Sequence, residues 1–303
     1  MRYAYVMFAR NKAPWVAETV RSMLAQTHPV DIYLSDQGST DGTLDVIRST
    51  VDGYNGPHRI HLIECPETER HGRAGLIAHI NWLQTVIDAD YFITTAADDI
   101  DHRDRVKRTV ETIAALPRVP LFFGTCQYFT GPNLEYQGIT AHPQESKWID
   151  PIEHLRDLVG GSCSGAWSRR LLDTYGPMPD TALVDVYMPF CAALEDGFYF
   201  LHEPLHSYVW RPDPNNTGLM GRADNSGSRR QRERIRELVQ CELIGNLYLM
   251  ARIVQGLYAA SPTERLESIL NSMYAILLTQ GSGWFDARHD LVKQGIRPAR
   301  MPY

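Results

Sequence analysis

The sequence contains few cysteines, and their spacing suits neither a metal centre nor a disulfide framework. No Cys-x-x-Cys pair and no Cys/His ligand spacing occurs among the five in 303 residues, which are Cys65, Cys126, Cys163, Cys191 and Cys241. A zinc site and a disulfide-stapled fold are therefore not expected. We expect these cysteines to act as small buried hydrophobes in a reducing compartment.

Long apolar runs are also missing. A membrane-spanning helix needs about 18 consecutive apolar residues, whereas the richest stretch, 243–254, is interrupted by Asn246 and Arg252. The apolar run Tyr3–Ala9 ends too early for a signal peptide. The sequence thus indicates a cytoplasmic protein, with peripheral association with a membrane left open.

An excess of positive charge is absent as well. The formal net charge is −6, which argues against a general nucleic-acid-binding protein. The arginine-rich run 229–236 is interleaved with Glu233, as is typical of a solvated helix face. A hydrophobic content of 44% and the length of the chain fit one large folded domain with a helical annex.

The first hundred residues do show a regular alternation of strand and helix patterns. Helical patterns begin after Asn11, which is expected to cap the first of them, and near Leu44 and Ala74. They separate short apolar runs typical of buried parallel strands, at 3–9, 32–34, 60–63 and 91–93. This alternation predicts an α/β fold, with a mainly parallel sheet flanked by helices on both faces.

The pattern is less regular after residue 100. Further elements are predicted as helices at 103–116, 169–175 and 184–194, and as strands at 119–123, 127–129 and 198–201. Residues 212–228 are rich in Pro, Asn and Gly and predict a loop, either a lid or a linker. Beyond it, 229–255 and 262–278 indicate a C-terminal helical extension for packing or for a homodimer.

A carboxylate, a glycine and several hydroxyl groups follow the predicted second strand. Asp36 follows the apolar run 32–34, with Ser35 between them, and precedes Gly38 and Ser39. The carboxyl edge of an α/β sheet is where such folds bind ligands. Asp36 can accept an N–H from a nucleotide base, and Gly38 lets the backbone approach the ligand closely. The stretch therefore predicts a nucleotide pocket.

A second acidic cluster follows the predicted fourth strand. Asp98 and Asp99 stand at the same sheet edge as Asp36, with Asp101 close behind. Clustered carboxylates suit Mg²⁺ or Mn²⁺, which would neutralise a diphosphate and stabilise it as a leaving group. We expect Asp98 to hold the metal and Asp101 to cap the next helix.

In four segments the chain resembles the inverting family 2 glycosyltransferases of GT-A fold. Asp36-Gln37-Gly38-Ser39-Thr40-Asp41-Gly42 differs at one position from the family's Asp-Asp-Gly-Ser-Thr-Asp-Gly. Phe8-Ala9-Arg10-Asn11 stands at the family's Pro-x-Tyr-Asn-like turn, and Asn81 lies at the usual 17 residues before Asp98. The weaker matches are Gly160-Gly161-Ser162, Asp185, Asp196-Gly197 and Glu203-Pro204-Leu205. The resemblance covers about residues 3–210.

The resemblance implies a role for each matching position. Asp36 would bind the base, most naturally uracil, although thymine offers the same edge. Asp98 would hold the metal, and Asp185 would be the general base that takes the proton of the acceptor hydroxyl. The remaining donor contacts would come from Phe8, Ala9, Arg10, Asn11, Gly38, Asn81 and Ala97.

Several departures bear on the metal. Ala96 replaces the first Asp of the family's Asp-x-Asp motif, Val184 replaces the Glu before the expected base, and the family's late His has no match. We hypothesise that Arg211, Arg222 or both bind the diphosphate and reduce the metal's share. Arg73 could also lie near the phosphates, or could mark a solvated helix start.

The sequence therefore predicts a glycosyltransferase domain at 1–211, a loop or lid at 212–228 and a helical extension at 229–303. Within the domain, 1–102 would bind the nucleotide-sugar and 103–211 the acceptor. The predicted reaction moves a hexose, most naturally from a UDP-sugar, with inversion. The acceptor would be a hydroxyl of a glycan, a lipid-linked molecule or another compound, a modified nucleic acid being less favoured. The alternatives are a nucleotidyltransferase and a catalytically decayed module that keeps the pocket.

Overall fold

The computed structural model describes residues 1–66, 72–131, 136–139, 143–157, 159, 161, 163–209, 211 and 229–276. Of 72–73, 136–139, 156–157 and 229–243 it describes the backbone alone. The chain divides into two compact units, Met1–Asp213 and Pro214–Tyr303.

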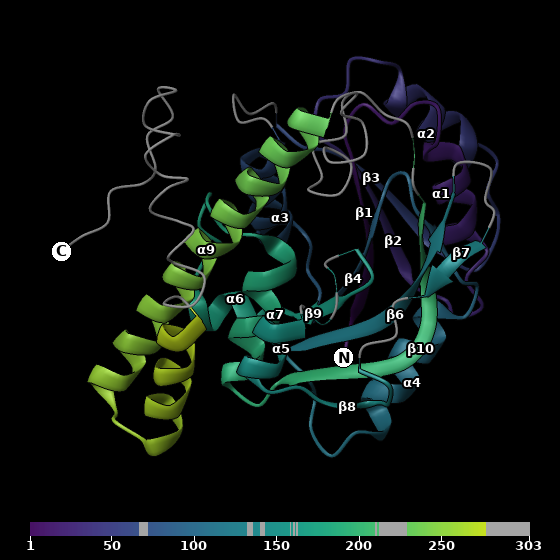
Figure 1. Cartoon of the computed structure of the whole chain (residues 1–303). Coiled ribbons are helices and arrows are strands. Elements are labelled where there is room, and N and C mark those ends of the chain that lie inside the picture. Colours follow the sequence, from purple (N-terminus) through teal and green to yellow (C-terminus); the bar gives the residue numbers. More distant parts are fainter. Residues whose placement is uncertain are drawn as a thin grey trace. The chain divides into compact units, whose positions relative to one another are not determined.

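The first unit is built on one mixed sheet (Figure 1). Four parallel strands form one side of it in the order β3-β2-β1-β4, with bounds β1 Tyr3–Ala9, β2 Asp31–Asp36, β3 Arg59–Glu64 and β4 Tyr91–Ala96. The other side pairs β6 (Phe122–Thr130) in parallel with β10 (Phe198–Val209). A short strand, β9 (Ala166–Ser168), joins the two sides by antiparallel pairing with β4 and β6.

Three more short strands pair antiparallel at the margins of this sheet. They are β5 (Ile100–Asp101), β7 (Tyr136–Ile139) and β8 (Lys147–Trp148). The predicted α/β fold with parallel strands in the first hundred residues is confirmed. The predicted strands 119–123 and 127–129 are wrong as two elements, because the end of the first and the whole of the second belong to the single strand β6.

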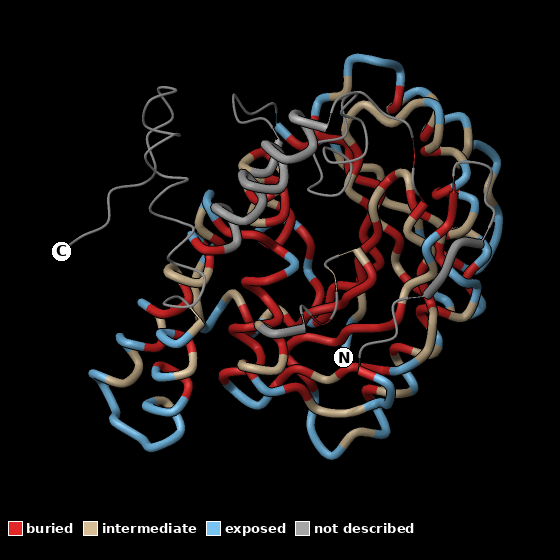
Figure 2. Tube along the Cα trace, viewed as in Figure 1, coloured by how far each residue is buried: buried red, intermediate tan, exposed pale blue. Residues whose placement is uncertain are grey.

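Helices cover both faces of the sheet, as the unbroken apolar sequence of β1 requires (Figure 1). Alternate β1 residues Tyr5 and Met7 share one core with Val20 and Val106, while Val6 is buried on the opposite face. The helices of the first face are α1 (Val16–Leu24), α2 (Thr43–Val51) and α4 (Arg105–Ala115). The other helices of this unit are α3 (Gly72–Val86), α5 (Pro151–Asp157), α6 (Arg169–Tyr175) and α7 (Val184–Leu194). Figure 2 shows the buried residues concentrated along the strands.

The described part of the second unit, residues 229–276, is mainly helical. Its α9 spans Arg229–Ala260, and residues 264–276 form a further helix. Val254 and Met273 are fully buried, and Gln255 donates a hydrogen bond to Tyr274, so the two helices are paired. The predicted helical extension is therefore present. Within the described residues, no helix is both long and apolar enough to cross a bilayer.

Candidate active site

Three strand ends meet at one edge of the sheet. In the register of the parallel strands, Ala9 at the end of β1 pairs with Asp36 of β2, and Phe8 pairs with Ala96 of β4. The backbone continues these ladders, because Gln37 N–H donates to Ala9 O at 2.9 Å and Ala97 N–H donates to Phe8 O at 3.1 Å. Four of the predicted donor-binding residues, Phe8, Ala9, Asp36 and Ala97, thus lie side by side at the carboxyl ends of the strands, where α/β sheets bind ligands.

The loops that follow β1 and β2 are fastened to each other. The amide of Asn11 donates to Ser39 Oγ at 2.9 Å, and the amide of Lys12 donates to Thr43 Oγ1 at 2.7 Å. In return, the amide of Thr40 donates to Asn11 Oδ1 at 2.9 Å. Asn11 adopts a left-handed backbone (φ 52°), so the prediction that it caps α1 is wrong. Its backbone amide and its side-chain oxygen instead form hydrogen bonds with the loop that follows β2.

Asp36 is held in one orientation by its own loop. Its residue is 3% exposed, and its carboxylate accepts hydrogen bonds from the amide and the hydroxyl of Ser39. Gly38 turns the chain between them with φ 62°, a left-handed conformation that glycine adopts at little cost. Each carboxylate oxygen has two lone pairs, so Asp36 keeps the capacity to accept a further N–H.

A buried histidine packs against the ends of β1 and β2. His79 on α3 lies 2.6 Å from Ser35 Oγ, and its ring meets the Phe8 ring edge-on with centroids 5.5 Å apart. Burial and the charge of Arg10 lower the pKa of His79 to about 4. His79 is therefore uncharged at neutral pH and packs as an aromatic ring beneath the expected base pocket.

Asp98 faces a lysine. Its Oδ2 lies 2.6 Å from Lys12 Nζ, and both side chains are 17% exposed. Burial and the charge of Asp99 raise the pKa of Asp98, while Lys12 acts in the opposite direction. The turn after β4 is thereby tied to the turn after β1.

The other two acids of the cluster point into the core. Asp99 accepts the amide of Val209 at 3.0 Å and lies 3.2 Å from His206 Nε2. Asp101 binds His206 Nδ1 at 2.7 Å and also Arg105 and Tyr5. The prediction that Asp101 caps a helix is therefore wrong, since it is an ion-pair partner one helical turn before Arg105.

These buried charges stabilise one another. Burial alone would raise the pKa of Asp101, but Arg105 and His206 outweigh it and lower that pKa to about 2. Burial disfavours charged His206, yet its contacts with Asp101 and Asp99 raise its pKa. Nothing in the sequence marked His206 or Arg105 as members of one network, because they are a hundred residues apart.

These positions do not fit a preformed metal site. Ala96 offers a methyl group, Asp99 and Asp101 face inward, and Asp98 contacts Lys12. Among the described residues, no three His, Cys, Asp or Glu side chains gather closely enough to hold an ion together. A metal at Asp98 stays a prediction from the sequence.

Asp185 lies in the first turn of α7 and is exposed. A Cβ placed on Gly161 would be 3.9 Å from its Oδ1 and 3.4 Å from Gln127 Nε2, so these groups share one small area. Through β9, Phe123 of β6 is level with Ile93 of β4. Gln127, four residues further along β6, is therefore level with the turn that follows β4.

A buried histidine fixes the start of α7. His154 on α5 places its ring nitrogens 3.0 Å from Val159 O and 3.0 Å from Val186 O. Burial lowers its pKa to about 4, so the ring is neutral at neutral pH and its single N–H can donate to one of these two carbonyl oxygens. The turn that carries Asp185 is thereby anchored to α5.

Other predicted donor-binding residues have other partners or lie outside the described part. Asn81 forms two hydrogen bonds with the backbone of Met178, at 2.9 and 3.0 Å. Arg211 pairs with Glu18 at 2.7 Å, and its side chain is 6% exposed. The side chain of Arg73 and all of Arg222 lie outside the described residues.

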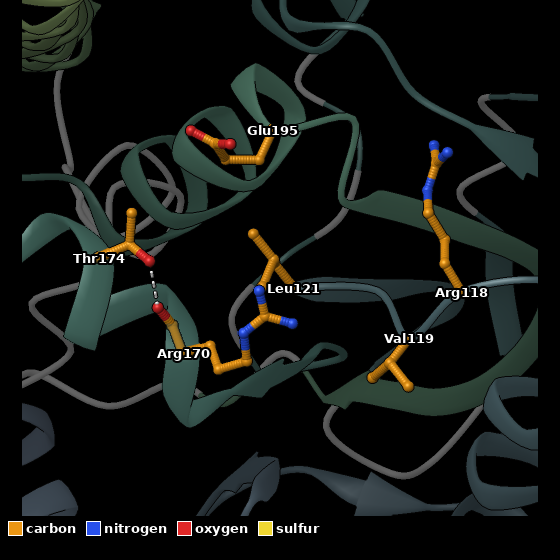
Figure 3. A pocket seen from close by; sticks show the side chains of 6 residues that line it. All are labelled: Arg118, Val119, Leu121, Arg170, Thr174 and Glu195. Atoms are coloured by element: carbon orange, nitrogen blue, oxygen red, sulfur yellow. Dashed lines mark hydrogen bonds between the residues drawn. The ribbon is translucent and has the colours of Figure 1, made fainter.

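A recess of about 330 Å³ lies elsewhere on this unit, at the opposite sheet edge, near the start of β6 (Figure 3). The guanidinium carbon of Arg118, at the rim of the recess, lies 4.1 Å from the centre of the Trp148 ring. Arg118 also donates a hydrogen bond to the backbone oxygen of Asp196 at 2.7 Å. Thr174 donates to the backbone oxygen of Arg170 on the same helix. We assign no chemistry to this recess.

Comparison with solved structures shows the same fold in glycosyltransferases. TarS from S. aureus with UDP-GlcNAc superposes with a TM-score of 0.58 and 13% identity over 97% of this chain and 81% of that one. A mannosyltransferase from Pyrobaculum calidifontis with GDP-Man and Mn²⁺ gives 0.53 and 15% over 91% and 80%. TarS with UDP gives 0.55 and 11% over 82% of this chain, which spans only 65% of that one.

The predicted GT-A fold is thus confirmed. A search of curated proteins gives no match. The family model "Glycosyl transferase family 2" matches residues 5–169, more than half of the chain and including the ends of β1, β2 and β4. The chain therefore belongs to glycosyl transferase family 2.

Proposed function

We propose that this protein transfers a hexose from a UDP-sugar to a hydroxyl acceptor, with inversion at the anomeric carbon. The observation that carries the proposal is the position of Asp36, fixed by Ser39 at the end of β2 and in register with Ala9. A carboxylate held there suits the N–H of uracil, with the backbone of Phe8–Arg10 beside the base.

Asp185 is the proposed general base. It is exposed at the start of a helix whose first turn is anchored by His154. The acceptor oxygen attacks the anomeric carbon from the side opposite the diphosphate, and the bond between that carbon and the diphosphate oxygen breaks. The acceptor proton passes to the Asp185 carboxylate, and the nucleoside diphosphate leaves with the electron pair. This in-line displacement inverts the anomeric centre.

Donor binding is tested first, by thermal unfolding with UDP-GlcNAc and with GDP-Man. A donor at a hundredfold excess over its Kd stabilises the folded protein by about 2.7 kcal/mol. Asp36→Ala should abolish that stabilisation, because it removes the base acceptor. Asp31→Ala is the matched control, since Asp31 begins the same strand and contacts His61 instead. Stabilisation by GDP-Man alone would reject the uracil assignment, and no stabilisation by either would reject the donor pocket.

Catalysis is tested by donor hydrolysis. Asp185→Asn should lower kcat by about 10²–10⁴-fold with donor binding unchanged, because only the proton acceptor is lost. Asp173→Asn, at an exposed acid of α6, is the control. Intact donor binding without turnover in the wild type, on any acceptor tried, would instead favour a non-catalytic binding module.

A further inference from the structure

Lys12 reaches from the turn after β1 to the turn after β4. Its Nζ is 2.6 Å from Asp98 Oδ2, with both side chains 17% exposed. The contact therefore lies at the rim of the strand ends rather than deep in the core. The sequence places Lys12 directly after the expected base-flanking residues, but nothing in the spacing indicated that it meets Asp98.

The backbone of Lys12 is fixed on both sides. Its own amide donates to Thr43 Oγ1 at 2.7 Å, and the amide of Ala13 donates to Asp41 Oδ2 at 3.0 Å. The ammonium also lies 5.5 Å from the centre of the Trp15 ring, within the range of a cation–π contact. Little conformational freedom is left for this side chain to lose on binding a ligand.

We propose that Lys12 is the cation that this site presents to the diphosphate of the donor, with Asp98 orienting its ammonium. The proposal rests on the proposed function. An ammonium has three N–H donors, so it can bind a carboxylate and a phosphate oxygen together. Lysine is an established binder of phosphate as a point charge.

The surrounding residues favour Lys12 over a protein-held metal in this role. Position 96 carries an alanine where the family has a carboxylate. Asp99 and Asp101 both contact His206 in the core. Of the arginines expected near the phosphates, Arg211 is paired with Glu18 at 2.7 Å. The side chain of Arg73 and all of Arg222 lie outside the described residues. Lys12 is then the positive group in contact with the acid that was expected to hold the metal. We therefore expect donor binding to persist without a divalent ion.

The experiment is a calorimetric titration of UDP into the wild type and four variants, in EDTA and then in Mn²⁺. The wild type should bind UDP in EDTA. Lys12→Met should raise the Kd about 10–100-fold, the effect expected for a hydrogen bond from a charged group. Lys12→Arg should keep most of the affinity. Lys107→Met, at an exposed lysine of α4, should leave the Kd unchanged.

The variant Asp98→Asn distinguishes a diphosphate bound by Lys12 from one bound by a metal ion on Asp98. If Lys12 binds the diphosphate, Asp98→Asn leaves the positive charge of Lys12 in place and should raise the Kd less than Lys12→Met does. If a metal on Asp98 binds it, the order of the two effects is reversed. UMP, which lacks the second phosphate, should lose less affinity than UDP in Lys12→Met. Thermal midpoints establish whether each variant is folded. If Lys12→Met does not fold, the UDP affinities of Lys12→Arg and Asp98→Asn still test the proposal.

Two results would overturn the proposal alone. They are unchanged UDP binding by Lys12→Met in EDTA, and wild-type binding that appears only with Mn²⁺ and is the same in Lys12→Met. If the wild type binds neither UDP nor GDP in either buffer, the donor pocket itself is rejected. Failure of the inference and failure of the proposed function are therefore distinguished.

Discussion

Asp98 and Asp101 stand three residues apart in one acidic stretch, but they belong to different regions of the molecule. Asp98 lies at the rim, partly exposed, with one lysine beside it. The side chain of Asp101 is fully buried and contacts Arg105, His206 and Tyr5. The two regions also differ in charge behaviour, since the pKa of Asp98 is raised and that of Asp101 is lowered to about 2.

This difference separates two uses of a carboxylate. A buried charge surrounded by partners costs much to unpair, because the remaining partner keeps an uncompensated charge in the core. A charge at the rim is only partly desolvated, and the groups around it can exchange for ligand groups. The inner acids therefore shape the sheet edge, and the rim acid is available to take part in binding.

The largest effect is expected at Asp101. Asp101→Asn leaves Arg105 and His206 without their shared carboxylate, so the free energy of unfolding should fall by about 3–5 kcal/mol. Urea denaturation measures the change. Asp104→Asn, at a nearby acid that accepts a hydrogen bond from Thr27 outside the buried network, is the control and should lower it much less. Equal losses in the two variants would contradict the comparison.

A smaller effect is expected from the charge of His206. Because its pKa is raised in the folded state, its stabilising contribution is complete below the unfolded pKa of about 6.5. That contribution is lost as the pH rises from there through the raised folded pKa, at up to about 1.4 kcal/mol per pH unit. His206→Gln should remove this part of the pH dependence. Denaturation curves between pH 6 and 9 test it, and parallel profiles for wild type and variant would refute it.

At acid pH, the free energy of unfolding should depend on pH in the opposite direction. The folded pKa of Asp101, about 2, lies below the unfolded value of about 3.9. Its stabilisation is therefore present above pH 4 and lost as the pH falls from 4 towards 2. Asp101→Asn should flatten the acid limb of the stability curve over that window. A limb as steep in the variant as in the wild type would show that other carboxylates dominate acid unfolding.

Sequence patterns could predict the rim better than the interior. Tyr3–Ala9 is an apolar run followed at once by polar residues, so both the strand and its polar end at the sheet edge could be predicted. Asp36 could be placed for the same reason. The partners of Asp99 and Asp101 could not, because His206 belongs to a strand a hundred residues later and shows no local pattern. The split of 119–129 into two strands failed because Gly124 breaks the apolar run without breaking the strand.

The smallest effect on stability is expected at Asp98, and it completes the comparison. Its ion pair with Lys12 keeps some contact with solvent, so it should stabilise the fold less than the fully buried network of Asp101 does. Its raised pKa means that folding disfavours the charged carboxylate, so a neutral amide of the same shape removes little. Asp98→Asn should therefore lower the free energy of unfolding by less than Asp101→Asn does, in urea denaturation of both variants. A loss as large as that of Asp101→Asn would place Asp98 among the structural acids, and the separation of rim from interior would not hold.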